Sequence, residues 1–240
     1  LALEYPLGLY TRVSGYLSPH ALRAFDFTSP GSAIAQRHPR VSPALEAGVR
    51  LAVDTTRLAV VGPVAGWALE LGVAGTAVAG GAAPFARADA ELQASQSFVR
   101  GFDRLFLHER LAFGANFGGE LAEQFYLPAA YNLRALPEGS LGLIGNGYTL
   151  GRLELHFPLA PVLAESIYLQ GLLGLDAGSI FFDLDRVWRQ RLAAAVVGSS
   201  VGLGPFIMRL QWARPFDVGA GVPVRGWLFY VSLLTPLGAL

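Results

Sequence analysis

Charged and apolar side chains alternate with a period of two residues along several stretches of the chain. In Gly151–Leu159, with sequence GRLELHFPL, Arg152, Glu154 and His156 share one parity, and the leucines and the phenylalanine share the other. Successive side chains of a strand point to opposite faces, so this alternation predicts a β-strand with one polar and one apolar face. A helix would scatter the same charges around its circumference.

The same alternation occurs upstream in Ala44–Thr56 and Phe85–Ser95, and Gly66–Val78 between them fits it as well. The charged residues expected on the polar face of these strands are Glu46, Arg50, Asp54, Glu70, Arg87, Asp89, Glu91 and Arg152. Their signs are mixed, whereas a strongly ion-selective pore would favour one sign. We therefore expect these side chains to form a cross-linked polar network.

Read along the whole chain, the pattern predicts about eleven strands separated by stretches rich in Gly, Pro, Ser and Asn. The predicted strands are Glu4–Leu17, Ala21–Phe27, Ala44–Thr56, Gly66–Val78, Phe85–Ser95, Leu105–Phe117, Tyr148–Pro158, Ile167–Phe182, Ala193–Gly204, Phe206–Pro215 and Gly226–Leu234. Asp183–Arg191 is expected to form a short helix or turn. No linker divides the sequence, so we interpret residues 1–240 as one domain.

The composition indicates that the apolar faces of the strands contact lipid. The chain has 29 glycines and 52% hydrophobic residues, and its mean hydropathy of +0.42 is high for a soluble domain. A lipid-exposed chain must satisfy its backbone polar groups as a helix or as a closed barrel. We therefore predict an all-β fold, a transmembrane antiparallel up-and-down β-barrel with hydrocarbon outside and a wet interior. A charge on the lipid face costs about 2 to 4 kcal/mol at the midplane, which enforces the alternation.

Two other folds remain possible on the sequence. Leu58–Ala86 has Glu70 as its only charge and is long enough for a membrane-spanning helix, although it contains Pro63 and Pro84. A soluble β-sandwich would also alternate, with its apolar faces packed inward. Strands of spanning length and aromatic residues near strand ends favour the barrel.

Several classes of chemistry are missing from the sequence. The absence of cysteine excludes disulfides and thiol catalysis, and the zero net charge without basic runs argues against nucleic-acid binding. The histidines, His20, His38, His108 and His156, show no metal-ligand spacing. Gly198–Gly202, with sequence GSSVG, matches Gly-x-Ser-x-Gly, but no histidine and acid are placed to activate its serine. We expect no enzymatic activity, no metal and no cofactor.

A series of motifs resembles the C-terminal barrel of the bacterial surface antigen superfamily, the BamA and TamA type, and is closest to the barrel of members linked to a TolB-like propeller. The segments that carry the resemblance are EQFYLPAAYNLRALPEG, LGRLELHFPL, LLGLDAGSIFFD, VGSSVGLGPFIMRLQWARPF and GWLFYVSL in the second half, and VDTTRLAVVGPVAGW upstream. In that family a loop arginine folds into the barrel and pairs with acids on the two following strands. The resemblance assigns these roles to Arg134, Glu154 and Asp176, although Ala135 and Leu136 replace the family's glycine and aromatic residue.

The resemblance also implies a location and a function. It implies a barrel of sixteen strands whose N-terminal strands precede this sequence, in the bacterial outer membrane. The expected role is an anchor or scaffold, or outer-membrane protein assembly or transport. The expected partners are the lipid bilayer, lipopolysaccharide and proteins of an envelope complex, without nucleic acid. The alternatives are a passive pore for small solutes and the translocator barrel of an autotransported lipase.

Overall fold

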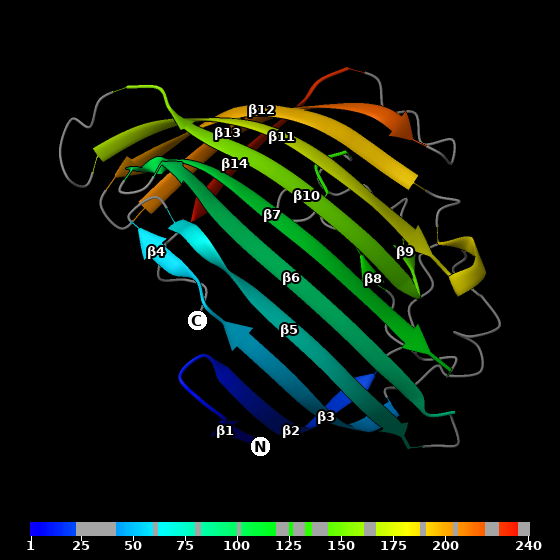
Figure 1. The fold of residues 1–240 in the computed structure, drawn as a ribbon. Coiled ribbons are helices and arrows are strands. Elements are labelled where there is room, and N and C mark those ends of the chain that lie inside the picture. Colours follow the sequence, from blue (N-terminus) through cyan, green and yellow to red (C-terminus); the bar gives the residue numbers. More distant parts are fainter. Residues whose placement is uncertain are drawn as a thin grey trace.

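The computed structural model describes residues 1–22, 42–59, 62–79, 83–99, 102–118, 125–126, 133–135, 144–160, 167–187, 191–203, 206–218 and 226–234. Nearly all of these residues lie in strands (Figure 1). The elements are β1 (Ala2–Pro6), β2 (Thr11–Leu22), β3 (Ser42–Asp54), β4 (Arg57–Ala59), β5 (Gly62–Val78), β6 (Phe85–Val99), β7 (Phe102–Phe117), β8 (Phe125–Tyr126), β9 (Ile144–Gly145), β10 (Gly147–Pro158), β11 (Ile167–Phe181), η1 (Leu184–Arg186), β12 (Arg191–Leu203), β13 (Phe206–Val218) and β14 (Leu228–Leu234).

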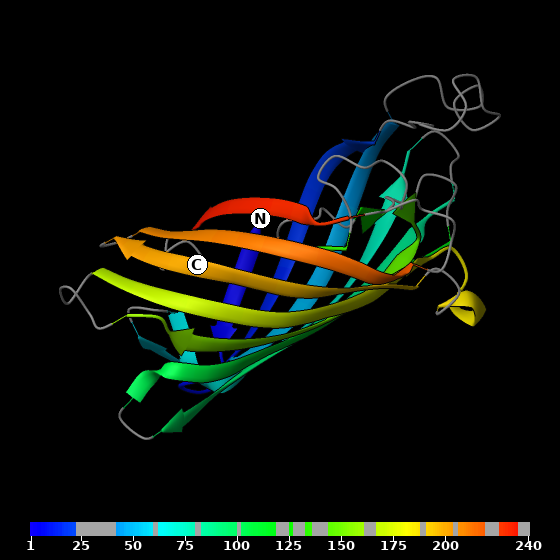
Figure 2. The ribbon, with the colours of Figure 1, turned by 90° about the horizontal axis from the view of Figure 1, so that it is seen from above.

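The long strands form one antiparallel sheet in the order β1-β2-β3-β5-β6-β7-β10-β11-β12-β13-β14, with β4 paired to β5. Each strand of this path therefore pairs with the long strand that follows it in the chain, as in an up-and-down arrangement. The sheet curls strongly, so that β14 comes round above the N-terminal strands when the molecule is seen from above (Figure 2). The short strands β8 and β9 form a separate pair. The predicted all-β antiparallel fold is confirmed.

The first predicted strand is wrong in its extent. Glu4–Leu17 is a hairpin in which β1 turns back onto β2, with Tyr5 opposite Val13 and a backbone hydrogen bond of 2.9 Å from Leu7 N to Thr11 O. The chain reverses through an apolar stretch that contains Gly8, and alternation of side chains does not show where a strand reverses. Ala21 and Leu22 end β2, and residues 23–27 of the second predicted strand lie outside the described residues.

The helical alternative for Leu58–Ala86 is wrong. This stretch contains the end of β4, the whole of β5 and the start of β6. Among the described residues no helix is long and apolar enough to cross a membrane. The excursion predicted within Asp183–Arg191 is present as the single turn η1.

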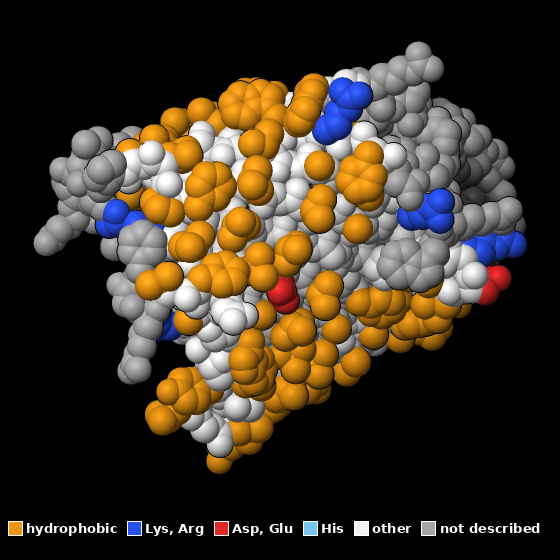
Figure 3. Space-filling view, turned by 45° about the horizontal axis from the view of Figure 1, so that its top comes forward, with side chains coloured by type: hydrophobic (Ala, Val, Ile, Leu, Met, Phe, Trp, Pro, Cys, Tyr) orange, Lys and Arg blue, Asp and Glu red, His pale blue; other side chains and the backbone are white. Residues whose placement is uncertain are grey.

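The two faces of the sheet differ in the manner expected for a barrel. Large apolar side chains on the convex face are exposed, among them Leu173, Leu175, Val197 and Trp212, and Figure 3 shows hydrophobic side chains spread over this face with few charged ones between them. The concave face holds the buried polar side chains, including Gln170, Ser200 and Gln211. A soluble β-sandwich requires the opposite arrangement, because its apolar rows pack against a second sheet. The sandwich alternative is therefore wrong.

Some glycines on the concave side lie under an aromatic ring of a neighbouring strand, namely Gly48, Gly114 and Gly202. A Cβ atom on Gly48 would meet the ring of Tyr16 at 2.6 Å, and Tyr16 is its cross-strand partner. Tyr168 lies in the same way over Gly202, opposite it in the register of β11 and β12. These pairs account for part of the high glycine content, because any larger residue would displace the ring.

Candidate functional site in the barrel interior

Leu133, Arg134 and Ala135 lie between β8 and β9 and are fully buried against the concave face of the sheet. Arg134 donates three hydrogen bonds to Asp176 of β11: its backbone N and Nε bond Oδ2 at 3.0 and 2.7 Å, and Nη2 bonds Oδ1 at 2.6 Å. Nη1 forms an ion pair with Oε1 of Glu154 on β10 at 2.6 Å. One arginine thus joins a turn to two adjacent strands, and we call this group of three residues the interior lock.

A second guanidinium balances the charge of the interior lock. Arg152 lies opposite Asp176 in the register of β10 and β11, and its Nε is 3.4 Å from Oδ1 of Asp176 and 4.0 Å from Oε1 of Glu154. Two carboxylates therefore face two arginines in a site that excludes water. Because a buried carboxylate without a partner is very costly, all four side chains are expected to be needed together.

The electrostatics keep Arg134 protonated. Burial by itself would lower the pKa of Arg134, but the hydrogen bonds to Asp176 and the negative charges of Glu154 and Asp176 raise it above its ordinary value. Gly174, two residues before Asp176, lies beside the guanidinium: a Cβ atom there would be 3.5 Å from Nη2 of Arg134. This distance is an ordinary van der Waals contact, so the guanidinium packs directly against the strand at Gly174.

Apolar contacts hold the rest of the turn. Leu133 and Ala135 belong to a buried cluster with residues of β7 and β10–β14, including Leu172, Ile180 and Tyr230. The hydroxyl of Tyr230 on β14 donates a hydrogen bond of 3.1 Å to the carbonyl oxygen of Arg134. The turn therefore spans the interior from β10 to β14. Ala135, which stands in place of the glycine of the motif that the sequence resembles, is fully buried, whereas Leu136 lies outside the described residues.

Polar residues of β6, β7 and β10 extend this site around Glu154. His156 Nε2 lies 3.2 Å from Glu154 Oε2, and His108 of β7 is opposite Glu154 in the register. Ser95 Oγ and His108 Nδ1 are hydrogen-bonded at 2.9 Å. The shared parity of these residues was visible in the sequence, but the pairing of β6, β7 and β10 that brings them together was not.

The interior charges predicted to form one network instead form separate ion pairs. Arg50 Nε lies 2.8 Å from Glu70 Oε1, and Arg87 Nε lies 3.6 Å from Asp89 Oδ1. Glu91 pairs with Arg110 of β7, whose Nη2 lies 2.8 Å from Glu91 Oε2.

The remaining two predicted members of the network differ from each other. Glu46 accepts a hydrogen bond of 2.7 Å from the Tyr16 hydroxyl. Asp54 is placed outside the network, because it ends β3 and instead accepts hydrogen bonds from Thr56 N and Oγ1 at 2.8 and 2.6 Å. A short carboxylate at the end of a strand readily caps the turn that follows it.

A second buried apolar cluster, which contains Val64, lies in the interior near the hairpin of β4 and β5. Gly66 has a φ of 93°, a conformation that glycine adopts without strain, and β4 pairs with the residues of β5 before it. Val64 is fully buried in a cluster with Phe106, Tyr168 and Ile207, which come from β7, β11 and β13. These strands are not neighbours in the sheet, so the contact crosses the interior.

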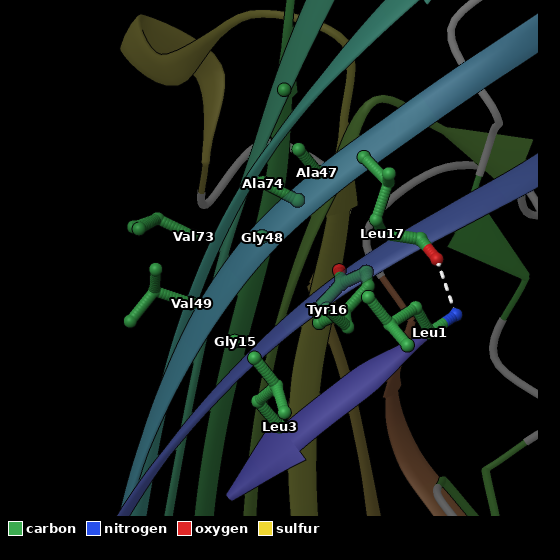
Figure 4. Close-up of a pocket in the computed structure, with 11 residues that line it drawn as sticks. Leu1, Leu3, Gly15, Tyr16, Leu17, Ala47, Gly48, Val49, Val73 and Ala74 are labelled. Atoms are coloured by element: carbon green, nitrogen blue, oxygen red, sulfur yellow. Dashed lines mark hydrogen bonds between the residues drawn. The ribbon is translucent and has the colours of Figure 1, made fainter.

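A hollow of about 590 Å³ lies on the apolar side of the first strands, lined by residues of β1, β2, β3 and β5 (Figure 4). Its small residues are Gly15, Ala47, Gly48, Ala74 and Gly75, and a Cβ atom on Gly75 would meet nothing within 4 Å. Among its lining residues Tyr16 carries the one polar side chain, and the Tyr16 hydroxyl already donates a hydrogen bond to Glu46. Within the described residues, no group of three or more His, Cys, Asp or Glu side chains could hold a metal ion.

These features define an all-β protein of the barrel type, with an apolar outer face and an interior braced by buried ion pairs. Comparison with known proteins agrees at the level of the fold. The structure of CdiB from Acinetobacter baumannii superposes with a TM-score of 0.61 at 17% sequence identity, over 97% of this chain. This chain spans 40% of the length of the CdiB chain. No family model and no curated protein matches the sequence.

Proposed function

We propose that the chain is part of a bacterial outer-membrane β-barrel that acts in protein transport or assembly at that membrane, with its interior closed by the Arg134 turn. The observation that carries this proposal is the inverted distribution of side chains. Leucine, valine and aromatic residues are exposed on the convex face, while charged groups are buried on the concave face. In water this arrangement is unfavourable, and in a bilayer it is the expected one.

The likeness in fold to CdiB supports a role in transport or secretion, and the motifs shared with the surface antigen superfamily support assembly of outer-membrane proteins or a scaffold role. The lipid bilayer, lipopolysaccharide and other envelope proteins are the partners that such a barrel requires. The proposed protein is not an enzyme. We also propose that residues 1–240 form a single domain and that further N-terminal strands complete a larger barrel.

The filled interior favours a closed barrel over a passive pore. The turn that carries Arg134 packs against the concave side of β10–β14. In a separate cluster, Val64 of β5 packs across the interior against Phe106 and Tyr168. Three hydrogen bonds and an ion pair hold the turn in place. A small solute would have to displace these contacts in order to pass through this part of the interior.

Conductance measurements test the proposal. The full-length protein that contains this chain is reconstituted into planar bilayers and compared with Arg134→Ala and with Arg12→Ala, in which an exposed ion pair with Glu4 is lost. We expect small steady current for the unchanged protein and for Arg12→Ala, and larger, fluctuating current for Arg134→Ala. A large steady current through the unchanged protein would favour the passive pore. Failure to insert into the bilayer would refute a membrane barrel.

A further inference from the structure

A carboxylate interrupts the apolar convex face at the middle of β7. Glu109 is exposed, and it has the parity of the outward-facing Leu111. Its cross-strand neighbours are Leu153 on β10 and Ala94 on β6. Figure 3 shows acidic atoms surrounded by apolar side chains in this face. Phe102 and Phe117 bound the strand, so Glu109 lies about as far from one end as from the other and is expected near the bilayer midplane.

Glu109 differs from the acids of the concave face. Glu70, Glu91 and Asp176 each contact an arginine. Within the described residues, the Glu109 carboxylate has no hydrogen bond and no ion pair. Since a carboxylate in hydrocarbon is costly, an unpaired one on the outer face of a barrel indicates that its partner comes from outside the chain.

An apolar slot of about 360 Å³ opens on the same face, and it begins on β7 at Leu111 rather than at Glu109 itself. Small residues form its floor on three strands: Ala90 on β6, Gly151 on β10 and Ala177 on β11. Leu111, two residues beyond Glu109, forms part of its side and lies opposite Gly151 in the register. The slot and the Glu109 carboxylate thus lie on the same face of the sheet, two residues apart along β7.

We propose that Glu109 and this slot form a docking site for a membrane-embedded segment of a partner protein, which brings a lysine or arginine to the carboxylate and a large apolar side chain into the slot. The proposal rests on the proposed function, because it requires lipid around the convex face. Charge complementarity selects the occupant. Hydrocarbon chains fill a slot but supply no hydrogen-bond donor, and the amino groups of lipids lie at the membrane surface rather than at the middle of a strand.

A second copy of the chain fits less well. Two copies related by a two-fold axis through this face would bring Glu109 against Glu109, and like charges in hydrocarbon repel. A partner segment with a basic residue neutralises the carboxylate and is in turn neutralised by it. The same pairing of opposite charges is the way in which ionisable residues are tolerated within membranes.

The probe is a fluorescent membrane-spanning peptide of leucine and alanine with one central lysine, together with a matched peptide that has leucine in its place. Energy transfer measures the binding of each to the labelled full-length protein in phosphatidylethanolamine and phosphatidylglycerol vesicles. We expect the lysine peptide to bind at least about tenfold more tightly than the leucine peptide. Glu109→Leu should abolish this difference. Ala177→Leu, which fills the slot, should weaken both peptides.

The matched control moves the carboxylate to Val197, which does not line this slot. In Glu109→Leu/Val197→Glu the new acid lies at the middle of β12, and the lysine peptide should bind more weakly than it does to the unchanged protein. Equal binding of both peptides to the unchanged protein, or lysine-peptide binding as tight in the double variant as in the unchanged protein, would overturn the docking site. Energy transfer between labelled copies that Glu109→Leu removes would assign the face to self-association and also overturn the proposal.

The same samples separate this inference from the proposed function. Protection from added protease and a heat-modifiable band on semi-native gels show that the unchanged protein has inserted and folded. If the protein does not insert, the membrane barrel and the docking site fail together. If it inserts, and the lysine peptide shows no preference that depends on Glu109, the docking site alone fails.

Discussion

Arg134 and Asp176 lie 42 residues apart in the sequence and are joined by three hydrogen bonds, the shortest of which is 2.6 Å. One of these bonds uses the backbone N of Arg134, so the carboxylate fixes the path of the turn as well as its side chain. Asp176 is therefore the central acceptor of the interior lock. Glu154 contributes one ion pair to Arg134 and also contacts His156.

Asp176→Asn should destabilise the folded protein strongly. The amide keeps the shape of the carboxylate but removes its charge and turns one acceptor into a donor that faces Arg134. Breaking a buried ion pair at one partner costs about 3 to 5 kcal/mol. Heat modifiability on semi-native gels and urea unfolding in vesicles measure the change. Glu4→Gln is the matched control, because Glu4 and Arg12 form an exposed pair; an equal effect of the two substitutions would contradict the interior lock.

Arg134→Lys should restore little of the stability that Arg134→Ala loses. Lysine keeps the positive charge but has a single nitrogen, whereas Arg134 binds Asp176 through Nε and Nη2 and Glu154 through Nη1. The ammonium can face one carboxylate and leaves the other without a close cation. Urea unfolding in vesicles should give Arg134→Lys a midpoint nearer to that of Arg134→Ala than to that of the unchanged protein. A midpoint equal to that of the unchanged protein would show that charge alone is sufficient.

Replacement of outward-facing residues tests contact with lipid. Val197 is exposed at the middle of β12, and Val197→Arg should cost about 2 to 4 kcal/mol if hydrocarbon surrounds it. Leu159, which is also exposed, follows the last residue of β10, and Leu159→Arg should cost about 0 to 1 kcal/mol near the membrane surface. Unfolding in vesicles measures both. Equal costs at the two depths would argue that water, rather than lipid, covers this face.

Local alternation was sufficient to assign most strands and the direction of their side chains. Glu154 and Arg152 were expected to point inward from the parity of a single strand, and the structure places Glu154 against Arg134 and Arg152 beside Asp176. Parity depends on neighbouring residues alone, so it can be read without knowledge of the fold. The pairing of Arg134 with Asp176 was expected from a family resemblance, since no local pattern connects a turn with a strand 42 residues away.

Other features depend on register and on chain reversals, which alternation does not determine. Ser95 and His108 meet because β6 and β7 pair in one particular register. Asp54 had the parity of an interior charge, but the strand ends there and a turn uses its carboxylate. Glu109 has outward parity in the sequence as well, yet its position beside a slot requires the alignment of β6, β10 and β11.

Substitution of two glycines by alanine distinguishes a glycine required by close packing from one that is not. Gly202→Ala would place a Cβ atom within 3.0 Å of the ring of Tyr168, which is buried and packed with Val64 and Phe106, so the ring has little room to move. Overpacking of this kind costs about 1 to 3 kcal/mol. Gly75→Ala on the convex side meets nothing within 4 Å, and alanine is favoured over glycine within a strand by about 0.5 to 1 kcal/mol.

The two substitutions should therefore have opposite effects on the urea midpoint of the protein in vesicles: lower for Gly202→Ala and equal or higher for Gly75→Ala. The fluorescence of the aromatic residues should also change in Gly202→Ala, because the ring of Tyr168 must move away from β12. Tyr168→Leu in the Gly202→Ala background removes the clash and should recover part of the loss. If Gly202→Ala unfolds at the same urea concentration as the unchanged protein, the ring is not held over the glycine, and the contact of Val64 with Phe106 and Tyr168 does not rigidly fill the interior.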